Sequence, residues 1–151
     1  MRCNMEIKRI SRFLSVSPQI DTGHVRQIAA QGFRTIINNR PDKEKVDQPL
    51  ASDLAVEAVS HGMNFVNQPV ISGNVTIGDS ERFAVELHRA EGPVLAFCRS
   101  GTRCTILWAL SEARHREVEV IMRFADSIGY DLKKYRQHME QIAAFHKLAG
   151  N

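Results

Sequence analysis

The sequence is short of cysteine, short of aromatic residues and without a long apolar run. Of its 151 residues, 3 are cysteine and 7% are aromatic. Three cysteines are too few, and odd in number, for the disulfide framework that holds small secreted domains together. No apolar run approaches the length needed to cross a bilayer. Residues 1–10, MRCNMEIKRI, lack the apolar core of a signal peptide, so we expect a cytoplasmic protein with no membrane partner.

Metal and nucleic-acid signatures are absent as well. The 6 histidines never fall at H-x-H or H-E-x-x-H spacing, and no C-x-x-C motif occurs. The formal charge is only +3, and lysine and arginine form no stripe interleaved with aromatic residues. We therefore expect no metal and no nucleic-acid partner.

Hydrophobic periodicity alternates between strand and helix along the chain. With 43% hydrophobic and 25% charged residues, the composition is that of a soluble globular protein. Strands are predicted within residues 6–17 (two short ones), 33–39, 63–70 and 93–97, and helices over residues 25–32, 54–62, 76–87, 102–114, 118–125 and 132–143. This order predicts a single α/β domain over residues 5–148, with a central, mostly parallel sheet flanked by helices.

In parallel sheets, ligands bind beyond the carboxyl ends of the strands. This rule brings residues 40–42, 71–74 and 98–103 to one edge of the predicted sheet. Ser72 and Asn74 would line a pocket there, unless they only form a turn.

Cys98 stands between a predicted strand and a predicted helix. A thiol in that position faces backbone N–H groups and the positive end of the helix dipole, which stabilise an anion and lower the pKa of the thiol. Gly101 permits backbone conformations that a Cβ forbids, and Arg103 can offer a planar fork of donors to an oxyanion. The alternative is that Cys98 packs as a small hydrophobic residue.

The motifs INNRPD, CRSGTR and LWAL, in this order and spacing, resemble the phosphatase-like domain of bacterial beta-lactamase-hydrolase-like proteins. That family is similar in fold to the dual-specificity, cysteine-dependent protein tyrosine phosphatases. The resemblance implies that Cys98 attacks phosphorus to form a phosphocysteine. The oxyanion would then be held by Arg103 and by the backbone of the residues before it, namely Arg99, Ser100, Gly101 and Thr102. It implies no cofactor, a phosphorylated or other oxyanion substrate, and a metallo-hydrolase partner in trans.

The sequence departs from the phosphatase pattern in ways that keep other functions open. Four residues separate Cys98 from Arg103, one fewer than in tyrosine phosphatases, and this resembles the active loop of rhodanese sulfurtransferases. The loop PVISGN, residues 69–74, has no carboxylate to protonate a leaving group. Asp42 is the nearest substitute and our prediction for the general acid, with a solvated turn residue as the alternative. Phe97 replaces a histidine that helps to organise the phosphatase loop.

Two further residues carry predictions of their own. Cys104 stands where the phosphatases have a hydroxyl that bonds the nucleophile, so a Cys98–Cys104 disulfide could form on oxidation; the alternative is that Cys104 only packs. Arg40 is expected to add positive charge at the pocket mouth, unless it is an exposed loop cation. Three functions follow: a cysteine-dependent phosphatase, a sulfurtransferase that uses a Cys98 persulfide, and a catalytically silent oxyanion-binding module.

Overall fold

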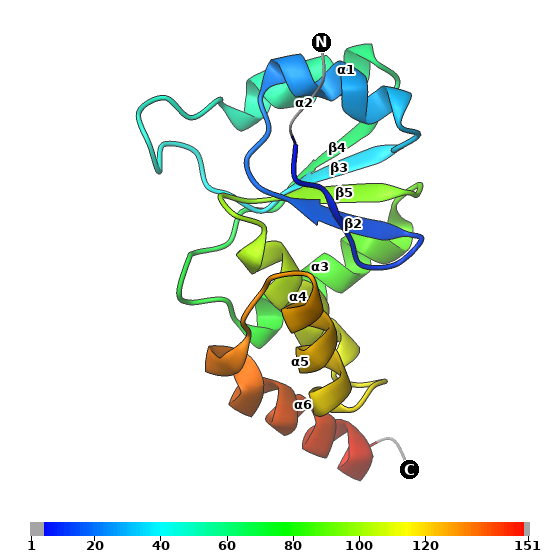
Figure 1. The fold of residues 1–151 in the computed structure, drawn as a ribbon, viewed down its shortest axis with the longest axis vertical. Coiled ribbons are helices and arrows are strands. Elements are labelled where there is room, and N and C mark those ends of the chain that lie inside the picture. Colours follow the sequence, from blue (N-terminus) through cyan, green and yellow to red (C-terminus); the bar gives the residue numbers. More distant parts are fainter. Residues whose placement is uncertain (1–4, 150–151) are drawn as a thin grey trace.

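The structure is a computed structural model that describes residues 5–149. A five-stranded sheet stands at its centre, in the order β1-β2-β5-β3-β4 (Figure 1). Its strands are β1 (Lys8–Arg9), β2 (Leu14–Ser17), β3 (Thr35–Asn38), β4 (Asn64–Asn67) and β5 (Val94–Phe97). The helices are α1 (Thr22–Ala30), α2 (Ala51–Ser60), α3 (Ile77–Arg89), α4 (Thr102–Glu112), α5 (Val118–Ser127), a 3-10 turn (Lys133–Tyr135) and α6 (Arg136–Ala149).

The sheet is mostly parallel, as the sequence predicts. Only β1 runs antiparallel to its neighbour, while β2, β3, β4 and β5 are parallel to one another. The three inner strands are buried along their whole length, and the central strand β5 is accordingly an unbroken apolar run, VLAF. The prediction of one α/β domain with a parallel sheet flanked by helices is confirmed.

Helices cover both faces of the sheet and form two hydrophobic cores. In Figure 1, α1 and α2 lie on one face, and α3 to α6 form a thicker layer on the other. Ile36 and Leu95 point into the core beneath α1 and α2. Ile37 and Ala96, their neighbours in sequence, point into the core beneath α4. This alternation follows from the two-residue period of a strand.

Helix α4 follows the loop after β5 and is buried on all sides over its middle. Every residue from position 103 to position 110 is buried. Because the helix is enclosed by α3, α5, α6 and the sheet, it fixes the loop that precedes it. Trp108 belongs to this core and packs against the Phe124 ring with centroids 5.5 Å apart.

The last predicted helix, residues 132–143, is wrong at its start. Leu132 lies before a 3-10 turn, and α6 begins only at Arg136. The Asp131 carboxylate accepts the Lys133 N–H at 3.0 Å, which competes with regular helix geometry. The turn places the Tyr135 hydroxyl where it accepts the Val75 N–H at 3.1 Å. A tertiary contact therefore decides where this helix begins.

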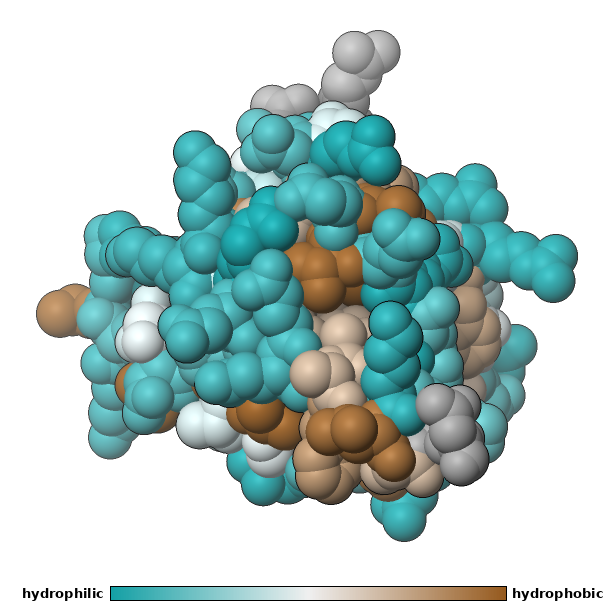
Figure 2. Space-filling model, turned by 90° about the horizontal axis from the view of Figure 1, so that it is seen from below, coloured by the Kyte–Doolittle hydropathy of each residue, from teal (hydrophilic) through white to brown (hydrophobic). Residues whose placement is uncertain are grey.

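Apolar side chains also reach the surface at the helical end of the molecule, where Figure 2 shows brown residues among teal ones. Phe145 and Leu148 of α6 are 74% and 87% exposed. Phe145, Ile77 and Ile142 line a groove on this surface. The groove shares no residue with the cavity that is lined by Arg99 and Arg103. Within residues 5–149, no helix has both the length and the apolar character that a membrane span requires.

Candidate active site

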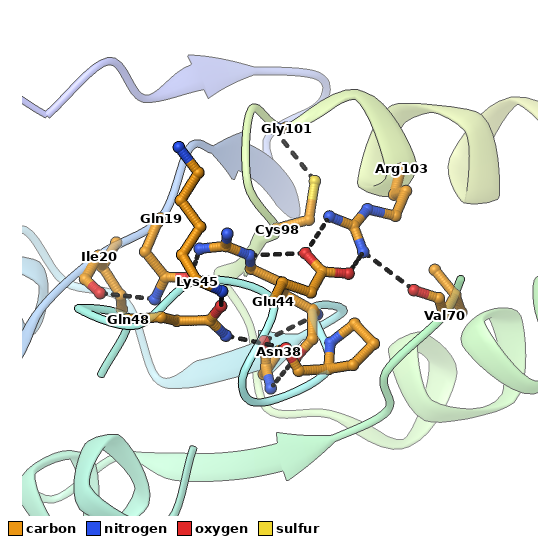
Figure 3. A network of polar contacts seen from close by, with 12 residues as sticks. Gln19, Ile20, Asn38, Glu44, Lys45, Gln48, Val70, Cys98, Gly101 and Arg103 are labelled. Atoms are coloured by element: carbon orange, nitrogen blue, oxygen red, sulfur yellow. Dashed lines mark hydrogen bonds and ion pairs between the residues drawn. The ribbon is translucent and has the colours of Figure 1, made fainter. Parts of the chain in front are cut away.

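The loops that follow β3, β4 and β5 meet at one edge of the sheet, as the parallel topology predicts. Arg103, after β5, donates from Nη1 to the Val70 carbonyl oxygen, after β4, at 3.0 Å. The same guanidinium binds Glu44, which lies in the loop after β3. Figure 3 shows these side chains converging beside Cys98. Segments that are distant in sequence therefore surround the thiol of Cys98. We call residues 98–103, which contain this thiol, the cysteine loop.

The carbonyl groups of the cysteine loop are bound from outside the loop. Three successive carbonyl oxygens accept hydrogen bonds: that of Arg99 from the Gln19 N–H at 3.2 Å, that of Ser100 from the Tyr130 hydroxyl at 3.1 Å, and that of Gly101 from the Thr105 hydroxyl at 2.9 Å. In a trans peptide the C=O of one residue and the N–H of the next point in opposite directions, so this arrangement turns the N–H groups of Ser100, Gly101 and Thr102 inward. Among the described residues, the N–H groups of Arg99 and Ser100 have no hydrogen-bond partner, and its inward direction makes that of Ser100 available to an anion.

Cys98 is surrounded by groups that favour its thiolate. Its Sγ accepts the Gly101 N–H at 3.1 Å. A hydrogen bond from the Cys104 thiol lowers the pKa of Cys98 most, burial opposes it, and the Cys104 N–H, the Arg103 charge and the Gly101 N–H lower it further, to about 6. Burial and the neighbouring Cys98 sulfur raise the pKa of Cys104 well above its ordinary value. At neutral pH, Cys98 is thus the ionised member of the pair and Cys104 the donor.

Arg103 is buried and held in a fixed orientation. Its residue is 5% exposed, and its Nη1 and Nη2 donate to the two carboxylate oxygens of Glu44 at 2.8 Å and 2.9 Å. Burial would lower the pKa of Arg103, but Glu44 and the Cys98 sulfur outweigh it and raise the pKa. A buried guanidinium needs such a partner, because an unpaired charge in the interior is costly.

Glu44 belongs to the candidate site through its contacts with Arg103 and Arg40, and sequence reasoning missed it. Arg103, its strongest partner, and Arg40, which donates from Nε at 2.8 Å, together outweigh partial burial and lower the pKa of Glu44 to about 2. Arg40 in turn donates from Nη1 to Gln19 Oε1 at 3.0 Å. The only available signal was indirect: a buried Arg103 needs a counter-charge from the same edge of the sheet.

The contacts of Arg103 leave the N–H donors along one edge of its guanidinium without a partner among the described residues. A guanidinium has five N–H donors in a rigid plane. Both hydrogens of Nη1 are engaged, one by Glu44 and one by Val70, and one hydrogen of Nη2 is engaged by Glu44. The Nε–H and the second hydrogen of Nη2 have no partner among the described residues. These two donors match the spacing of two oxygens on a tetrahedral oxyanion.

Gly101 has a conformation and a position that other residues cannot adopt. Its φ is +94°, in the left-handed region. A Cβ added there would lie 2.2 Å from the Tyr130 hydroxyl oxygen. The glycine therefore lets the chain turn sharply enough to aim its N–H at Cys98 while Tyr130 holds the loop from behind.

Asp42 and Arg40 occupy positions that sequence alone did not indicate. Asp42 Oδ1 accepts the Ala51 N–H at 2.8 Å, at the first residue of α2, so this carboxylate helps to begin a helix. Its assignment as general acid stays a prediction. Arg40 is 4% exposed, so the alternative of an exposed loop cation is wrong. It binds Glu44 rather than lining the cavity next to the loop, and direct contact between Arg40 and an anion stays a prediction.

A cavity of about 710 Å³ opens beside the cysteine loop. Its lining includes Arg99, Ser100, Thr102 and Arg103 from the loop, Ser72 and Asn74 from the segment after β4, and residues of the segment 131–138. The predicted place of Ser72 and Asn74 in the pocket is confirmed. Cys98 itself is 1% exposed and lies behind this wall. Within the described part of the chain, no three histidine, cysteine, aspartate or glutamate side chains are grouped to hold a metal ion.

A family model for the phosphatase-like domain of beta-lactamase hydrolase-like proteins matches residues 6–115. The chain belongs to this family. The matched segment contains the sheet, the cysteine loop and α4. The resemblance inferred from the motifs INNRPD, CRSGTR and LWAL is therefore confirmed.

Relatives of this phosphatase-like domain include longer proteins. The beta-lactamase hydrolase-like protein of Agrobacterium fabrum is 33% identical over 142 residues, a match that covers 93% of this chain and 33% of the relative. The chain thus spans about a third of the length of that curated relative.

Solved structures share the fold of this phosphatase-like domain. A candidate phosphatase from Neisseria meningitidis Z2491 superposes with a TM-score of 0.82 at 36% identity, covering 90% of this chain and 97% of that one. The active form of Tk-PTP superposes with a TM-score of 0.69 at 14% identity, covering 91% of this chain and 95% of the other. The second likeness bears on the fold alone. Together the comparisons support a phosphatase-like function.

Proposed function

We propose that this chain is a cysteine-dependent phosphatase in which the Cys98 thiolate attacks the phosphorus of a phosphate monoester. The observation that carries the proposal is the environment of one sulfur atom: Cys98 Sγ accepts the Gly101 N–H at 3.1 Å, and its pKa is lowered to about 6. A thiolate is the attacking form of cysteine, and a lowered pKa beside a cationic group is typical of a nucleophile rather than of a packing residue.

In the first step, a bond forms between Cys98 Sγ and phosphorus as the bond between phosphorus and the ester oxygen breaks. The leaving oxygen takes a proton from a general acid, for which Asp42 is our prediction, and departs as an alcohol or phenol. In the second step, water attacks the phosphocysteine, inorganic phosphate leaves and the thiolate is restored. Every atom comes from substrate and water, so the reaction needs no redox partner.

Charge that develops on the phosphate oxygens would be met by donors already in place. The Nε–H and the remaining Nη2 hydrogen of Arg103 form a planar fork, and the N–H groups of Arg99 and Ser100 have no other partner among the described residues. Donors that are nearly aligned before the reaction need little reorganisation to stabilise a transition state. Glu44 supports this arrangement by holding the far side of the guanidinium.

Access to the sulfur requires a small movement of the loop. Cys98 is 1% exposed, while Arg103 lines the cavity and also acts electrostatically on Cys98. A phosphate in the cavity would therefore bind the guanidinium first, and the loop would open toward the cavity to let the sulfur reach phosphorus. Gly101 supplies the backbone freedom for such an opening.

Sulfur transfer is the second candidate. The specific observation in its favour is the short spacing, because only four residues separate Cys98 from Arg103. The absence of a carboxylate in residues 69–74 also favours a reaction that needs no general acid. In that reaction Cys98 would take a sulfane sulfur from a donor such as thiosulfate, releasing sulfite, and pass it to a thiophilic acceptor.

Two parallel assays separate these functions. One measures phosphate released from p-nitrophenyl phosphate, and the other measures thiocyanate formed from thiosulfate and cyanide, each with wild type, Cys98→Ser and the matched control Cys104→Ser. The phosphatase proposal expects phosphate release that disappears with Cys98→Ser and persists with Cys104→Ser. Thiocyanate formation with the same dependence would support sulfur transfer. Inactivity in both assays, with inorganic phosphate still raising the melting temperature, would overturn both proposals and leave an oxyanion-binding module.

A further inference from the structure

The cavity beside the cysteine loop carries more positive charge than a single phosphate group needs. Its volume, about 710 Å³, lies in the range of small-molecule sites, roughly 300–1,000 Å³. The cationic and imidazole groups in its lining come from two walls: Arg99 and Arg103 from the loop, and Lys133, Lys134 and His138 from the segment opposite. Asp131 contributes the single carboxylate of this lining. A cavity of this size and charge can hold a second anionic group.

The lysines and Arg99 are not committed to other residues. Lys133, Lys134 and Arg99 are exposed, and within residues 5–149 their side chains form no hydrogen bond or ion pair. Some exposed arginines elsewhere are paired, as Arg114 is with Glu81 at 3.1 Å, while Arg26 and Arg123 have no partner among the described residues and do not line this cavity. Cations left without a carboxylate partner in a concave site are typical of anion binding. Lys133 and Lys134 can therefore receive a ligand without breaking an existing ion pair.

The lysine wall is held at a fixed place relative to the loop. Tyr135 accepts the Val75 N–H at 3.1 Å, and Tyr130 donates to the Ser100 carbonyl oxygen at 3.1 Å. These two tyrosines flank the segment that carries Lys133 and Lys134. The distance between the two groups of cations is thus set by the fold before a substrate arrives, which lowers the entropy cost of binding.

His138 adds an independent sign of a ligand position in the same wall. Its Nδ1 is buried and has no hydrogen-bond partner, and its ring packs on Tyr135 with centroids 5.2 Å apart. A buried polar atom without a protein partner is uncommon and is often satisfied by water or by a ligand. His138 also lines the cavity, so its ring can contact a bound molecule.

We propose that the substrate is a small molecule with two phosphate groups, one hydrolysed at the cysteine loop and the other bound by Lys133 and Lys134. This inference rests on the proposed phosphatase function and names the substrate class for that site. A soluble sugar bisphosphate and a phosphorylated lipid headgroup share this chemistry. A phosphopeptide fits less well, because its main chain would extend beyond a single cavity while both cationic groups lie within it.

The test measures KM and kcat with fructose 1,6-bisphosphate, fructose 6-phosphate and a phosphotyrosine peptide. A further arm uses vesicles that contain phosphatidylinositol 4-phosphate. The variant is Lys133→Ala/Lys134→Ala, and the matched control is Arg26→Ala/Arg123→Ala, which removes the same charge from exposed positions on α1 and α5. We expect the lysine variant to raise the KM for the bisphosphate about tenfold relative to that for the monophosphate, an effect that the control lacks. The difference should shrink at high ionic strength.

Each result decides the proposal. Preference for the soluble bisphosphate or for the vesicles, lost in the lysine variant, supports it and identifies the source of the two phosphates. Equal effects on mono- and bisphosphates, no effect, or a preference confined to the phosphopeptide would overturn it. Calorimetry with Cys98→Ser separates this inference from the proposed function. If wild type hydrolyses nothing but the serine variant binds the bisphosphate in a lysine-dependent way, the second subsite stands and the phosphatase proposal fails.

Discussion

Arg103 and Glu44 form a two-bond ion pair at 2.8 Å and 2.9 Å across 59 residues of sequence. The pair uses the end of the guanidinium that faces away from its two unused donors. It is therefore a support that aligns Arg103 rather than a contact that substrate must break.

Glu44→Gln should lower kcat/KM for p-nitrophenyl phosphate about 100-fold. The glutamine side chain can accept only one of the two hydrogen bonds that Arg103 donates to Glu44, so the guanidinium would no longer hold its free donors toward the phosphate oxygens. The matched control is Glu112→Gln, which breaks the exposed pair with Arg116 and should change little. A gain in kcat/KM would contradict this prediction and show that Glu44 competes with substrate for Arg103. Melting temperatures of both variants check that the fold is retained.

The pH dependence of stability should carry the signature of Glu44. Its pKa is about 2 in the folded chain against an ordinary value of 4.5. A carboxyl with a lowered folded pKa stabilises the folded state above its unfolded pKa, and that contribution is lost as pH falls through the folded value. Denaturant unfolding of wild type should thus weaken between pH 4.5 and about 2 more than unfolding of Glu44→Gln. Parallel curves would contradict the prediction.

The thiolate of Cys98 should titrate with a midpoint near pH 6, well below the ordinary value of 9.0 for a thiol. Iodoacetamide labelling of Cys98, followed by mass spectrometry from pH 4 to pH 9, measures this midpoint. The Cys104 thiol is the strongest contributor, so Cys104→Ala should move the midpoint upward. Cys104→Ser keeps a donor and should move it less. Labelling that rises only near pH 9 in wild type would contradict the prediction.

Gly101→Ala should destabilise the fold by about 2 kcal/mol or more, through a left-handed φ that alanine disfavours and a clash with the Tyr130 hydroxyl. Gly73→Ala is the matched control, since its φ is +78° but nothing lies within 4 Å of the added Cβ. The difference between the two variants in urea unfolding measures the clash alone. Tyr130→Phe should recover part of that difference, and no recovery would show that the hydroxyl is not the obstacle.

Peroxide should convert Cys98 and Cys104 to a disulfide. The Cys98 thiolate reduces peroxide and becomes a sulfenic acid with loss of hydroxide; the Cys104 thiol then attacks that sulfur and water leaves. Both residues are buried free thiols within interaction range of each other. Mass spectrometry in a Cys3→Ser background should find the bridge, and Cys104→Ala should accumulate sulfinic Cys98 instead. Sulfinic Cys98 without any bridge in the parent chain would exclude the prediction.

Asp42→Asn separates proton donation from helix initiation, because asparagine keeps an oxygen that can accept the Ala51 N–H. If Asp42 is the general acid, kcat for an alkyl phosphate should fall about 10² to 10⁴-fold. The rate for p-nitrophenyl phosphate, whose leaving group needs no proton, should change little. Equal rates for wild type and variant with both substrates would remove Asp42 from the mechanism.

Local signals predicted much of this molecule correctly. Thr76 and Asp79 form a capping box at the start of the helix predicted from residue 76, and in it each side chain accepts a backbone N–H of the other residue. Such a motif depends on residues three apart, so the sequence contains all of it. Strand β5 was equally easy to predict, because its unbroken apolar run reflects burial on both faces.

Contacts between segments that are distant in the sequence could not be predicted in the same way. The loop after β3 offers three carboxylates, Asp42, Glu44 and Asp47, and nothing in their spacing shows which one reaches Arg103. The predicted start of α6 is wrong because it depends on a hydrogen bond between Tyr135 and the Val75 N–H. These two residues are 60 positions apart in the sequence, so no local pattern reveals the bond.

The amino-acid sequence by itself determined the order of strands and helices, the edge of the sheet where the site lies, and Cys98 and Arg103 as its central residues. These follow from periodicity and from the chemistry of a thiol beside a helix start, which are local properties. Only the tertiary structure decided that Glu44 holds Arg103, that Tyr130 fixes the loop, and that Lys133 and Lys134 share the cavity. Those relationships depend on how packed layers bring remote loops together, and no local pattern encodes that geometry.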